Sequence, residues 1–306
     1  MKSAEQSTAR DRPPKSDAWT TLHSRESQIL QATALAKLAW LVHGFSTRVG
    51  GASRLDGRAV FSLGHTAWDT RANVLANRAK LLDALGARQM KLVTLRQIHS
   101  DAIHALDSLP ESTPRGDAAM TRLPGVLLSV QTADCVPVLL VDTERRAVAA
   151  VHAGWRGTLR RIVAKAVGRM RAAFGTRPEN VVAVLGSGIG QCCYEVGPEV
   201  AQAYASQFAL AHEWFDGPFE QLATGEDPTP LKFLSMAPPG HNPPPPRVRL
   251  NLVAANRWQL LDAGVKASNI IASELCTACR TDLLFSYRRE GARTGRLMAV
   301  IGMRES

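Results

Sequence analysis

The chain has no long hydrophobic run. Hydrophobic residues make up 45% of its 306 residues, but no stretch approaches the ~20 consecutive apolar residues that a membrane-spanning helix needs. Residues 1–25 are polar and lack the apolar core of a secretory signal. We therefore expect no membrane association, a cytoplasmic location and a disordered leader over residues 1–28.

Continuous basic runs and aromatic-rich basic patches are also missing. The net charge is +10, but lysine and arginine are spread along the chain and only 6% of the residues are aromatic. A protein that binds single-stranded nucleic acid interleaves aromatic side chains with a basic groove. The densest basic block, residues 156–171, is better explained as a helix with a solvated face. We expect no nucleic-acid partner, and a small anionic substrate such as phosphate explains local arginines equally well.

Cysteine is scarce and odd in number. Five cysteines in a chain without a secretory signal argue for free thiols and against a disulfide framework. Cys276 and Cys279 form a CxxC pair, but a zinc knuckle needs a second pair and none lies close by in the sequence. A thioredoxin-like context is also missing. We interpret these cysteines as incidental, or one of them as helping to shape a site.

The chain is nevertheless rich in strand-like and helical patterns. Its length allows two domains or one large α/β unit. Apolar runs predict strands, and because they are nearly continuous in apolar residues, both faces of the sheet should be covered. A Pro-rich stretch at about 216–247 predicts an exposed insertion. The predicted strands are 41–46, 92–95, 125–130, 136–141, 147–151, 181–185 and 297–301. The predicted helices are 72–85, 159–174 and 250–261, with a turn at 47–51, Thr158 as a candidate cap and Gly86 and Gly175 as ends.

Three short motifs each place a histidine or cysteine near the end of a strand-like run. They contain His99, Cys135 and His152. Their wide spacing does not fit a zinc finger, whose ligands come in close pairs, but it suits ligands from separate strand ends. Two imidazoles and one thiolate leave a fourth position open, as in catalytic zinc sites. Asp134 is placed to orient a ligand or to take a proton. A buried thiol with two hydrogen-bonded histidines remains the alternative.

Candidate ligand-binding residues surround this set. The glycine-rich turn 186–190 follows a strand, where backbone N–H groups can approach a phosphate, or where a tight turn simply needs positive φ. Arg48 and Arg156 lie in loops at strand ends, where they bind phosphate or carboxylate, or are merely solvated. The candidate substrate-binding residues are Arg48, Gln97, Arg156, Gly188, Gly190 and Cys193.

Taken together, six segments resemble the YfiH-like family, which is also called the laccase-domain or multicopper polyphenol oxidase family. The segments are residues 43–51, 96–100, 131–137, 151–157, 188–196 and 285–289, and they occur in the family's order. The resemblance covers residues 41–302.

The resemblance implies a single α+β domain over residues 29–306, with mixed β-sheets packed between helices, related to toxin hydrolases that use a Cys–His pair. It implies zinc held by His99, Cys135 and His152, with copper as a further option. Together with Asp134, which the sequence places beside Cys135, these three residues form the candidate catalytic set. The implied activity is phosphorolysis of adenosine, inosine and S-methyl-5'-thioadenosine, with adenosine deamination beside it. Purine nucleosides and phosphate are thus the implied partners. The oligomeric state stays open, and a monomer is compatible with the sequence.

Two alternatives remain. One is a Cys–His hydrolase that edits a peptidoglycan precursor, with Cys135 as nucleophile and His152 or His99 as base. The other is a copper-dependent polyphenol oxidase, or laccase. A true multicopper oxidase needs many histidine ligands, whereas this chain has eight histidines in all.

Overall fold

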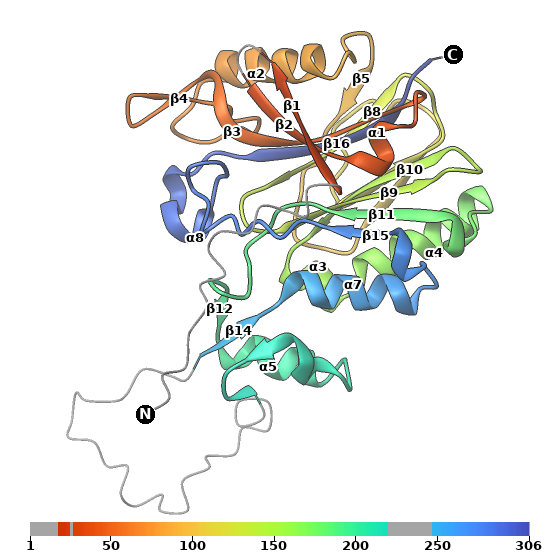
Figure 1. Cartoon of the computed structure of the whole chain (residues 1–306), viewed down its shortest axis with the longest axis vertical. Coiled ribbons are helices and arrows are strands. Elements are labelled where there is room, and N and C mark those ends of the chain that lie inside the picture. Colours follow the sequence, from red (N-terminus) through yellow and green to blue (C-terminus); the bar gives the residue numbers. More distant parts are fainter. Residues whose placement is uncertain (1–17, 25–26, 220–246, 306) are drawn as a thin grey trace, which may run out of the picture.

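The computed structural model describes residues 18–24, 27–219 and 247–305. Its centre is a pair of β-sheets (Figure 1). Within the described residues the first sheet has seven strands in the order β1-β2-β3-β16-β8-β5, with β4 paired to β3. These strands are β1 (Trp19–Ser24), β2 (Ser27–Ala32), β3 (Leu41–Leu55), β4 (Arg58–Val60), β5 (Lys91–Val93), β8 (Val126–Thr132) and β16 (Leu297–Met303).

The second sheet, as far as the structure describes the chain, has six strands in the order β15-β11-β9-β10-β7-β6. They are β6 (Ile103–Leu106), β7 (Ala118–Thr121), β9 (Val136–Asp142), β10 (Ala147–Ala153), β11 (Val181–Leu185) and β15 (Ile270–Ala272). Both sheets are mixed. Most pairs are antiparallel, whereas β5–β8, β6–β7 and β11–β15 are parallel. The predicted mixed α+β architecture is confirmed.

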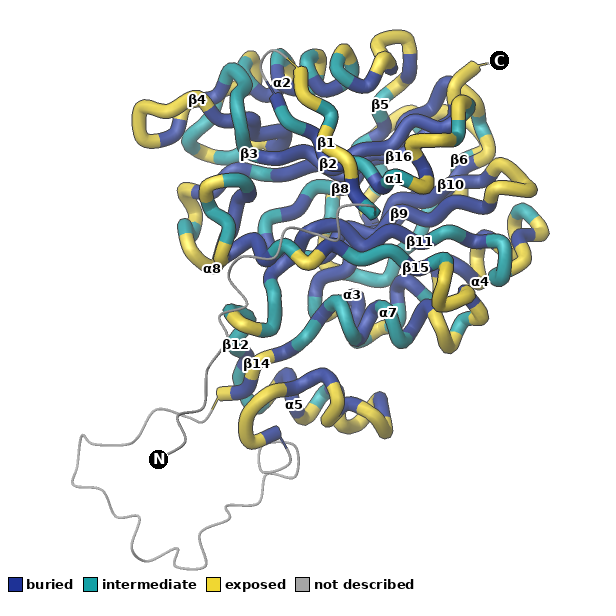
Figure 2. Tube along the Cα trace, in the orientation of Figure 1, coloured by how far each residue is buried: buried dark blue, intermediate teal, exposed yellow. Residues whose placement is uncertain are grey.

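Helices cover the outer faces of the two sheets (Figure 1). Along β9, Val138 and Leu140 pack in the cluster that includes the helices, while Leu139 and Val141 pack in the cluster between the sheets. This alternation follows from the two-residue period of a strand. It explains the continuous apolar run, because both faces of the strand are buried as predicted (Figure 2). Helix α2 (Arg71–Ala84) packs on the first sheet, and α4 (Ile162–Phe174) and α7 (Leu252–Asp262) pack on the second.

The remaining elements are short. A three-stranded sheet consists of β12 (Glu195–Val196), β14 (Val248–Leu250) and β13 (Phe215–Asp216). The short helices are α1 (Thr33–Ala36), α3 (Trp155–Leu159), α5 (Pro198–Ala205) and α8 (Tyr287–Glu290). The 3-10 helices in the described part of the chain are η1 (Pro178–Asn180), η2 (Ala211–Trp214), η3 (Ala267–Asn269) and η4 (Gly291–Arg293). No helix among the described residues is long and apolar enough to span a bilayer.

The predicted helix 159–174 is two helices. Arg161 adopts a left-handed backbone with φ of +61°, so α3 ends before it and α4 begins after it. Thr158 is therefore not a cap. Its buried hydroxyl accepts a hydrogen bond from Asn256 of α7, at 2.9 Å. Gly175, with φ of +68°, ends α4 as predicted.

Three boundaries also differ from the prediction. The strand β1 lies inside the segment expected to be a leader, and Trp19 packs edge-on against Phe45. The polar, threonine-rich sequence of β1 did not predict a strand. One face of an edge strand is solvated, so its sequence lacks a continuous apolar run. The expected turn at 47–51 is a bend within β3, where the register with β4 shifts. Asp216 belongs to β13, and residues 220–246 of the expected insertion lie outside the described residues.

Two glycine substitutions should change stability in opposite directions. A Cβ at Gly186 would lie 2.4 Å from two ring atoms of Phe45, so we expect Gly186→Ala to lower the free energy of unfolding by about 1–3 kcal/mol. A Cβ at Gly168, in the middle of α4, meets nothing within 4 Å, so Gly168→Ala should raise it by about 0.5–1 kcal/mol. Urea unfolding measures both. If both substitutions changed the free energy of unfolding by the same amount, the close contact between Gly186 and Phe45 would be contradicted.

Candidate active site

The structure brings the three predicted ligands together at one end of the second sheet. His99 lies in the loop between β5 and β6, Cys135 immediately precedes β9, and His152 is in β10. The β9–β10 register pairs His152 with Pro137, which places the imidazole beside the thiol. The candidate ligand atoms of the three residues all lie within 4.8 Å of one another. The two imidazole rings meet edge-on, with centroids 5.1 Å apart.

A buried carboxylate, Asp117, holds this arrangement in place. Its Oδ1 accepts hydrogen bonds from Nδ1 of His152 at 2.8 Å and from the backbone N–H of His99 at 3.0 Å. Its Oδ2 accepts from the backbone and hydroxyl of Ser100, at 2.6 and 2.7 Å. Because Nδ1 of His152 is engaged, the other ring nitrogen is left for Cys135. The same bonds hold His99 in a left-handed backbone conformation, with φ of +56°.

The electrostatics favour a charged pair in the metal-free protein. Burial opposes ionisation of the Cys135 thiol, but charge and hydrogen bonds from His152 and His99 outweigh it and lower its pKa to about 6. Burial also disfavours the charged imidazole of His152, yet Cys135 and Asp117 raise its pKa to about 9. For Asp117, burial is outweighed by the hydrogen bonds from His152 and Ser100, and the pKa falls well below its usual range. A thiolate and an imidazolium therefore coexist near neutral pH.

A pocket of about 510 Å³ opens over this cluster. Its walls carry arginines and aromatic rings, and each arginine lies over a ring. The pairs, with the distance from guanidinium carbon to ring centroid, are Arg156–Trp155 at 4.4 Å, Arg288–Tyr194 at 5.3 Å and Arg296–Tyr287 at 6.0 Å. Guanidinium groups bind phosphate and carboxylate oxygens in pairs. The pocket thus combines a metal-competent cluster with a cationic, ring-lined wall.

The three arginines differ in how far they are already engaged. Both terminal nitrogens of Arg288 donate to the carbonyl oxygen of Glu195 at 2.9 Å, and Arg296 donates to Gly295 at 3.0 Å. The exposed Arg156 side chain makes no hydrogen bond to the described residues. Arg156 is therefore the pocket arginine with the most donors left for an anionic ligand.

Two further predicted residues, Gln97 and Asp134, line the pocket but are engaged with the protein. The side-chain amide of Gln97 makes two hydrogen bonds of 2.7 Å to the backbone of Gln131. The carboxylate of Asp134 accepts from the Thr277 hydroxyl and from the backbone N–H of Arg288, both at 2.6 Å.

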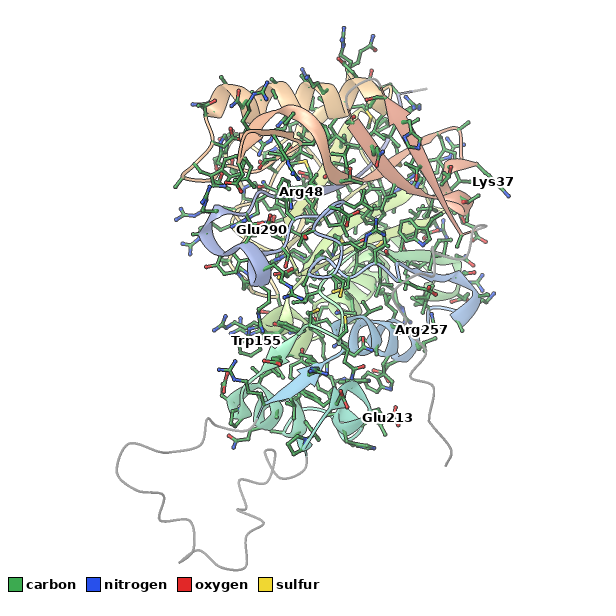
Figure 3. The ribbon with its side chains drawn as sticks, turned by 60° about the vertical axis from the view of Figure 1, so that its left-hand side comes forward. Lys37, Arg48, Trp155, Glu213, Arg257 and Glu290 are labelled. Carbon is green, nitrogen blue, oxygen red and sulfur yellow. The ribbon has the colours of Figure 1, made fainter. Side chains whose placement is uncertain are left out.

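Arg48 is not brought to the pocket. Its guanidinium pairs with Glu290 at 2.8 Å, donates to the carbonyl oxygen of Thr281 at 2.6 Å and lies over the ring of Phe285. Figure 3 shows Arg48 beside Glu290 and away from Trp155. The position of Arg48 in the bend of β3 directs it to the loop 281–290, so it ties two segments together and lines a different cavity.

The glycine-rich turn does not line the pocket either. Three of its backbone N–H groups donate within the protein: Gly186 to Pro137, Ile189 to Asp134 and Gly190 to the sulfur of Cys276. Neither Gly188 nor Gly190 has positive φ, so close packing and not turn geometry explains these glycines. Cys193 likewise points to other cysteines and not into the pocket.

Sequence reasoning missed several pocket residues. They are His65, Gln131, Tyr194, Tyr287, Arg288 and Arg296. Tyr194, Tyr287 and Arg288 fall within motifs singled out above, at 188–196 and 285–289, but nothing in one sequence shows that these motifs face the same pocket. For His65 and Arg296 no local signal marks a ligand-binding role.

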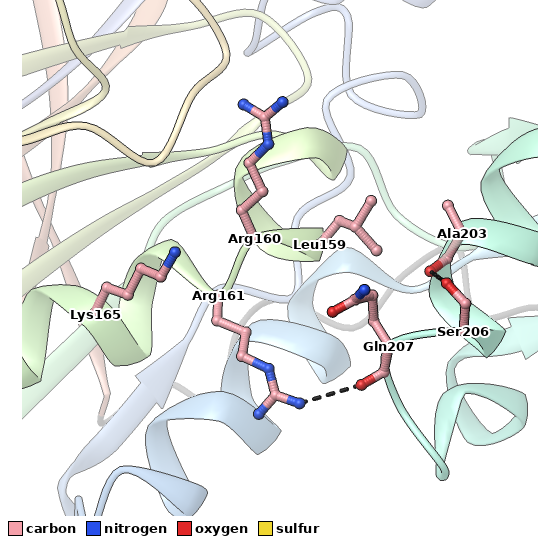
Figure 4. A pocket seen from close by; sticks show the side chains of 7 residues that line it. All are labelled: Leu159, Arg160, Arg161, Lys165, Ala203, Ser206 and Gln207. Carbon is pink, nitrogen blue, oxygen red and sulfur yellow. Dashed lines mark hydrogen bonds between the residues drawn. The ribbon is translucent and has the colours of Figure 1, made fainter.

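A second, basic pocket lies on the surface of the second sheet's helices (Figure 4). It is lined by Leu159, Arg160, Arg161, Lys165, Ala203, Ser206 and Gln207. Arg161 donates to the carbonyl oxygen of Gln207 at 3.2 Å, and Lys165 pairs with Asp101 at 2.5 Å. These contacts fit the solvated helix face predicted for residues 156–171.

The mixed α+β fold and the open Cys/His cluster define a class of candidate metalloenzymes, and comparison with known proteins identifies the family. Residues 42–304 match the family described as multi-copper polyphenol oxidoreductase laccase. The chain belongs to this family.

Relatives agree over nearly the whole chain. Adenosine deaminase RL5, from an unknown prokaryotic organism, is 36% identical over 87% of this chain and 96% of its own length. Purine nucleoside phosphorylase YlmD from Geobacillus stearothermophilus is 32% identical, covering 87% and 92% of the two chains. The crystal structure of Bacillus licheniformis hypothetical protein YfiH superimposes with a TM-score of 0.78 at 28% identity, covering 94% of this chain and all of that one.

The charged Cys135–His152 pair predicts the pH dependence of alkylation. In chelator-treated protein, the thiolate of Cys135 forms as pH rises through its pKa, so its alkylation rate should rise with a midpoint near pH 6, well below the value of about 8.5 for an ordinary thiol. Asp117→Asn removes the charge that raises the pKa of His152, so the midpoint should move to higher pH. Iodoacetamide labelling, followed by mass spectrometry of the Cys135 peptide, measures this.

Ser100→Ala is the matched control. It removes one hydrogen bond to Asp117 and leaves the carboxylate charged, so its midpoint should shift less than that of Asp117→Asn. A wild-type midpoint at the ordinary thiol value would exclude the ion pair.

Proposed function

We propose that this protein is a zinc-dependent purine nucleoside phosphorylase. Its substrates are adenosine, inosine and S-methyl-5'-thioadenosine, and it also deaminates adenosine. The observation that carries the proposal is the His99, Cys135 and His152 cluster, open to a pocket whose wall presents the unengaged Arg156. Relatives named purine nucleoside phosphorylase and adenosine deaminase, each matched over most of its length, support an enzymatic role.

The donor set fits zinc. Two imidazole nitrogens and one thiolate are ligands that zinc accepts, and three protein ligands leave a position for substrate. Asp117 holds His152 through the ring nitrogen that faces away from Cys135, the usual support of a ligating imidazole. Gly154 leaves room for the sulfur, because a Cβ there would lie 2.9 Å from Sγ of Cys135. Bound zinc supplies Lewis acidity and, for deamination, lowers the pKa of water.

The remaining chemistry belongs to the side chains of the pocket. In phosphorolysis a phosphate oxygen forms a bond to C1′ of the ribose, the bond from C1′ to N9 of the purine breaks, and the base leaves with the bonding electrons. Arg156 binds and orients the phosphate, and Arg288 and Arg296 add positive charge along the same wall. Tyr194, Tyr287 and Trp155 offer ring faces to the nucleoside. Gln97 and Asp134 hold the backbone around Cys135 in position.

Removal of Arg156 should weaken phosphate binding. Hydrogen bonds to charged groups contribute about 1.5–3 kcal/mol, so Arg156→Ala should raise KM for phosphate by about 10- to 100-fold. The KM for nucleoside should change less. Arg160→Ala is the matched control. Arg160 is also an exposed arginine and lies at the end of the same helix, but it lines the second pocket and not the pocket over the cluster. Steady-state phosphorolysis assays measure both constants. Equal KM values for phosphate in the two variants would contradict the proposed phosphate site.

A Cys–His hydrolase is the second candidate, because Cys135, His152 and Asp117 form a chain from thiol to imidazole to carboxylate. Such a chain activates a cysteine nucleophile, and an amide of a peptidoglycan precursor would be its substrate. Metal content separates the two candidates. Stoichiometric zinc that slows alkylation of Cys135, with phosphorolysis lost in Cys135→Ala, supports the phosphorylase. A zinc content that is the same in wild type and Cys135→Ala, with a rapidly alkylated Cys135 and equal phosphorolysis in the two proteins, supports the hydrolase.

Laccase activity is a weaker candidate than either of these two, despite the family's description. Two histidines and one cysteine suit a single copper ion. The two metal-competent clusters of the described residues contain only these two histidines between them, whereas a multicopper centre needs many more.

A further inference from the structure

Four cysteines that are far apart in the sequence meet in space. The pair Cys192 and Cys193 lies in the loop between β11 and β12, and the CxxC pair Cys276 and Cys279 lies between β15 and α8. All four sulfurs are within 4.8 Å of one another. No second pair lies near the CxxC motif in the sequence, but a pair from a distant loop meets it in space, so the interpretation of these cysteines as incidental was wrong.

The distances fit a shared metal ion better than disulfide bonds. Sγ of Cys279 lies 3.6 Å from that of Cys192 and 3.4 Å from that of Cys193, whereas disulfide sulfurs are about 2.05 Å apart. All five cysteines of the chain are free thiols. A tetrahedron of sulfurs at the zinc–sulfur distance of about 2.3 Å has edges of about 3.8 Å, close to both separations.

The surroundings of the four sulfurs also suit thiolates. The backbone N–H of Gly190 donates to Sγ of Cys276 at 3.1 Å. A terminal nitrogen of Arg289 lies 4.0 Å from Sγ of Cys193, and its Nε donates to the carbonyl oxygen of Ala278 inside the CxxC turn. Gly190 gives the sulfurs room, since a Cβ there would approach two of them to 3.2 and 3.3 Å. Hydrogen-bond donors and a positive charge stabilise metal-bound thiolates.

We propose that Cys192, Cys193, Cys276 and Cys279 bind a second, structural zinc ion. Four thiolates complete a tetrahedral shell, so this site has no open position and carries no substrate. It differs in this respect from the cluster of His99, Cys135 and His152.

The second zinc ion fastens one wall of the substrate pocket. It joins the loops 186–194 and 273–280, which also meet through the bridge of Gly188 to Cys276, a hydrogen bond from Thr277 to the carbonyl oxygen of Gly188, and a 3.0 Å hydrogen bond between the hydroxyls of Ser187 and Ser273. Tyr194, which follows Cys193, lines the pocket, and the Thr277 hydroxyl donates to Asp134. Loss of this metal should therefore loosen the wall while the three ligands of the other site stay in place.

Metal counting on the full chain tests the proposal. Wild type purified without chelator should contain about two zinc ions per chain, and Cys135→Ala and Cys279→Ser should each contain about one. Because Cys279 is exposed, serine should be tolerated there. Cobalt substitution gives a second readout: thiolate-to-cobalt charge-transfer bands of a four-thiolate site should persist in Cys135→Ala and weaken sharply in Cys279→Ser.

Other results would overturn the four-thiolate site. They are a zinc content that Cys279→Ser does not lower, and a disulfide between Cys279 and Cys192 or Cys193 in unreduced peptide maps. If Cys279→Ser fails to fold, Cys192→Ser, which alters the opposite loop at an exposed position, takes its place. None of these readouts depends on turnover, so the proposal stands or falls separately from phosphorolysis.

Discussion

The whole site depends on the buried carboxylate of Asp117. A charged group with no exposed surface costs several kcal/mol unless its oxygens are satisfied. Here Asp117 accepts hydrogen bonds from His152, His99 and Ser100, and its own carbonyl oxygen accepts one from the backbone N–H of His152 at 2.7 Å. One residue immediately before β7 therefore orients an imidazole in β10 and holds the loop that carries the other. Removing it would leave both candidate ligands without their support.

The sheets make this dependence possible. β7 pairs with β10, and β10 with β9, in continuous antiparallel register, so the ends of three strands and their loops converge at one edge. The packed core on both faces of β9 leaves these strands little freedom to shift. Against that rigid frame two residues of the site keep left-handed backbones, His99 at φ of +56° and Asp134 at +94°. Such conformations persist where surrounding bonds over-determine them.

Local pattern predicted part of the fold and picked out three residues that the structure brings together, but it did not predict their neighbours. The apolar period of β9 and β10 predicted these strands, whereas β1, β6 and β7 were not predicted. His99, Cys135 and His152 stand at the ends of apolar runs, which made them candidate ligands. The Cys192–Cys193 pair meets the CxxC pair only because β11 and β15 are parallel neighbours, a pairing that no local pattern reveals. The prediction that Arg48 lies in the substrate site was wrong for a similar reason. A loop arginine looks alike in sequence whether it faces a ligand or, as here, a glutamate 242 positions away.

Asp134 connects the two metal-competent clusters, and this connection bears on its role. The carbonyl oxygen of Asp134 accepts from Ile189 at 2.7 Å, and its two carboxylate oxygens accept from Thr277 and Arg288. The residue before Cys135 thus joins the glycine-rich turn, the CxxC loop and the arginine wall of the pocket. Both carboxylate oxygens of Asp134 are thus occupied by hydrogen-bond donors of the protein. Asp134 is therefore better explained as the residue that positions Cys135 and Arg288 relative to each other than as a proton carrier. On this interpretation the geometry of the pocket depends on the loops that the four cysteines bring together.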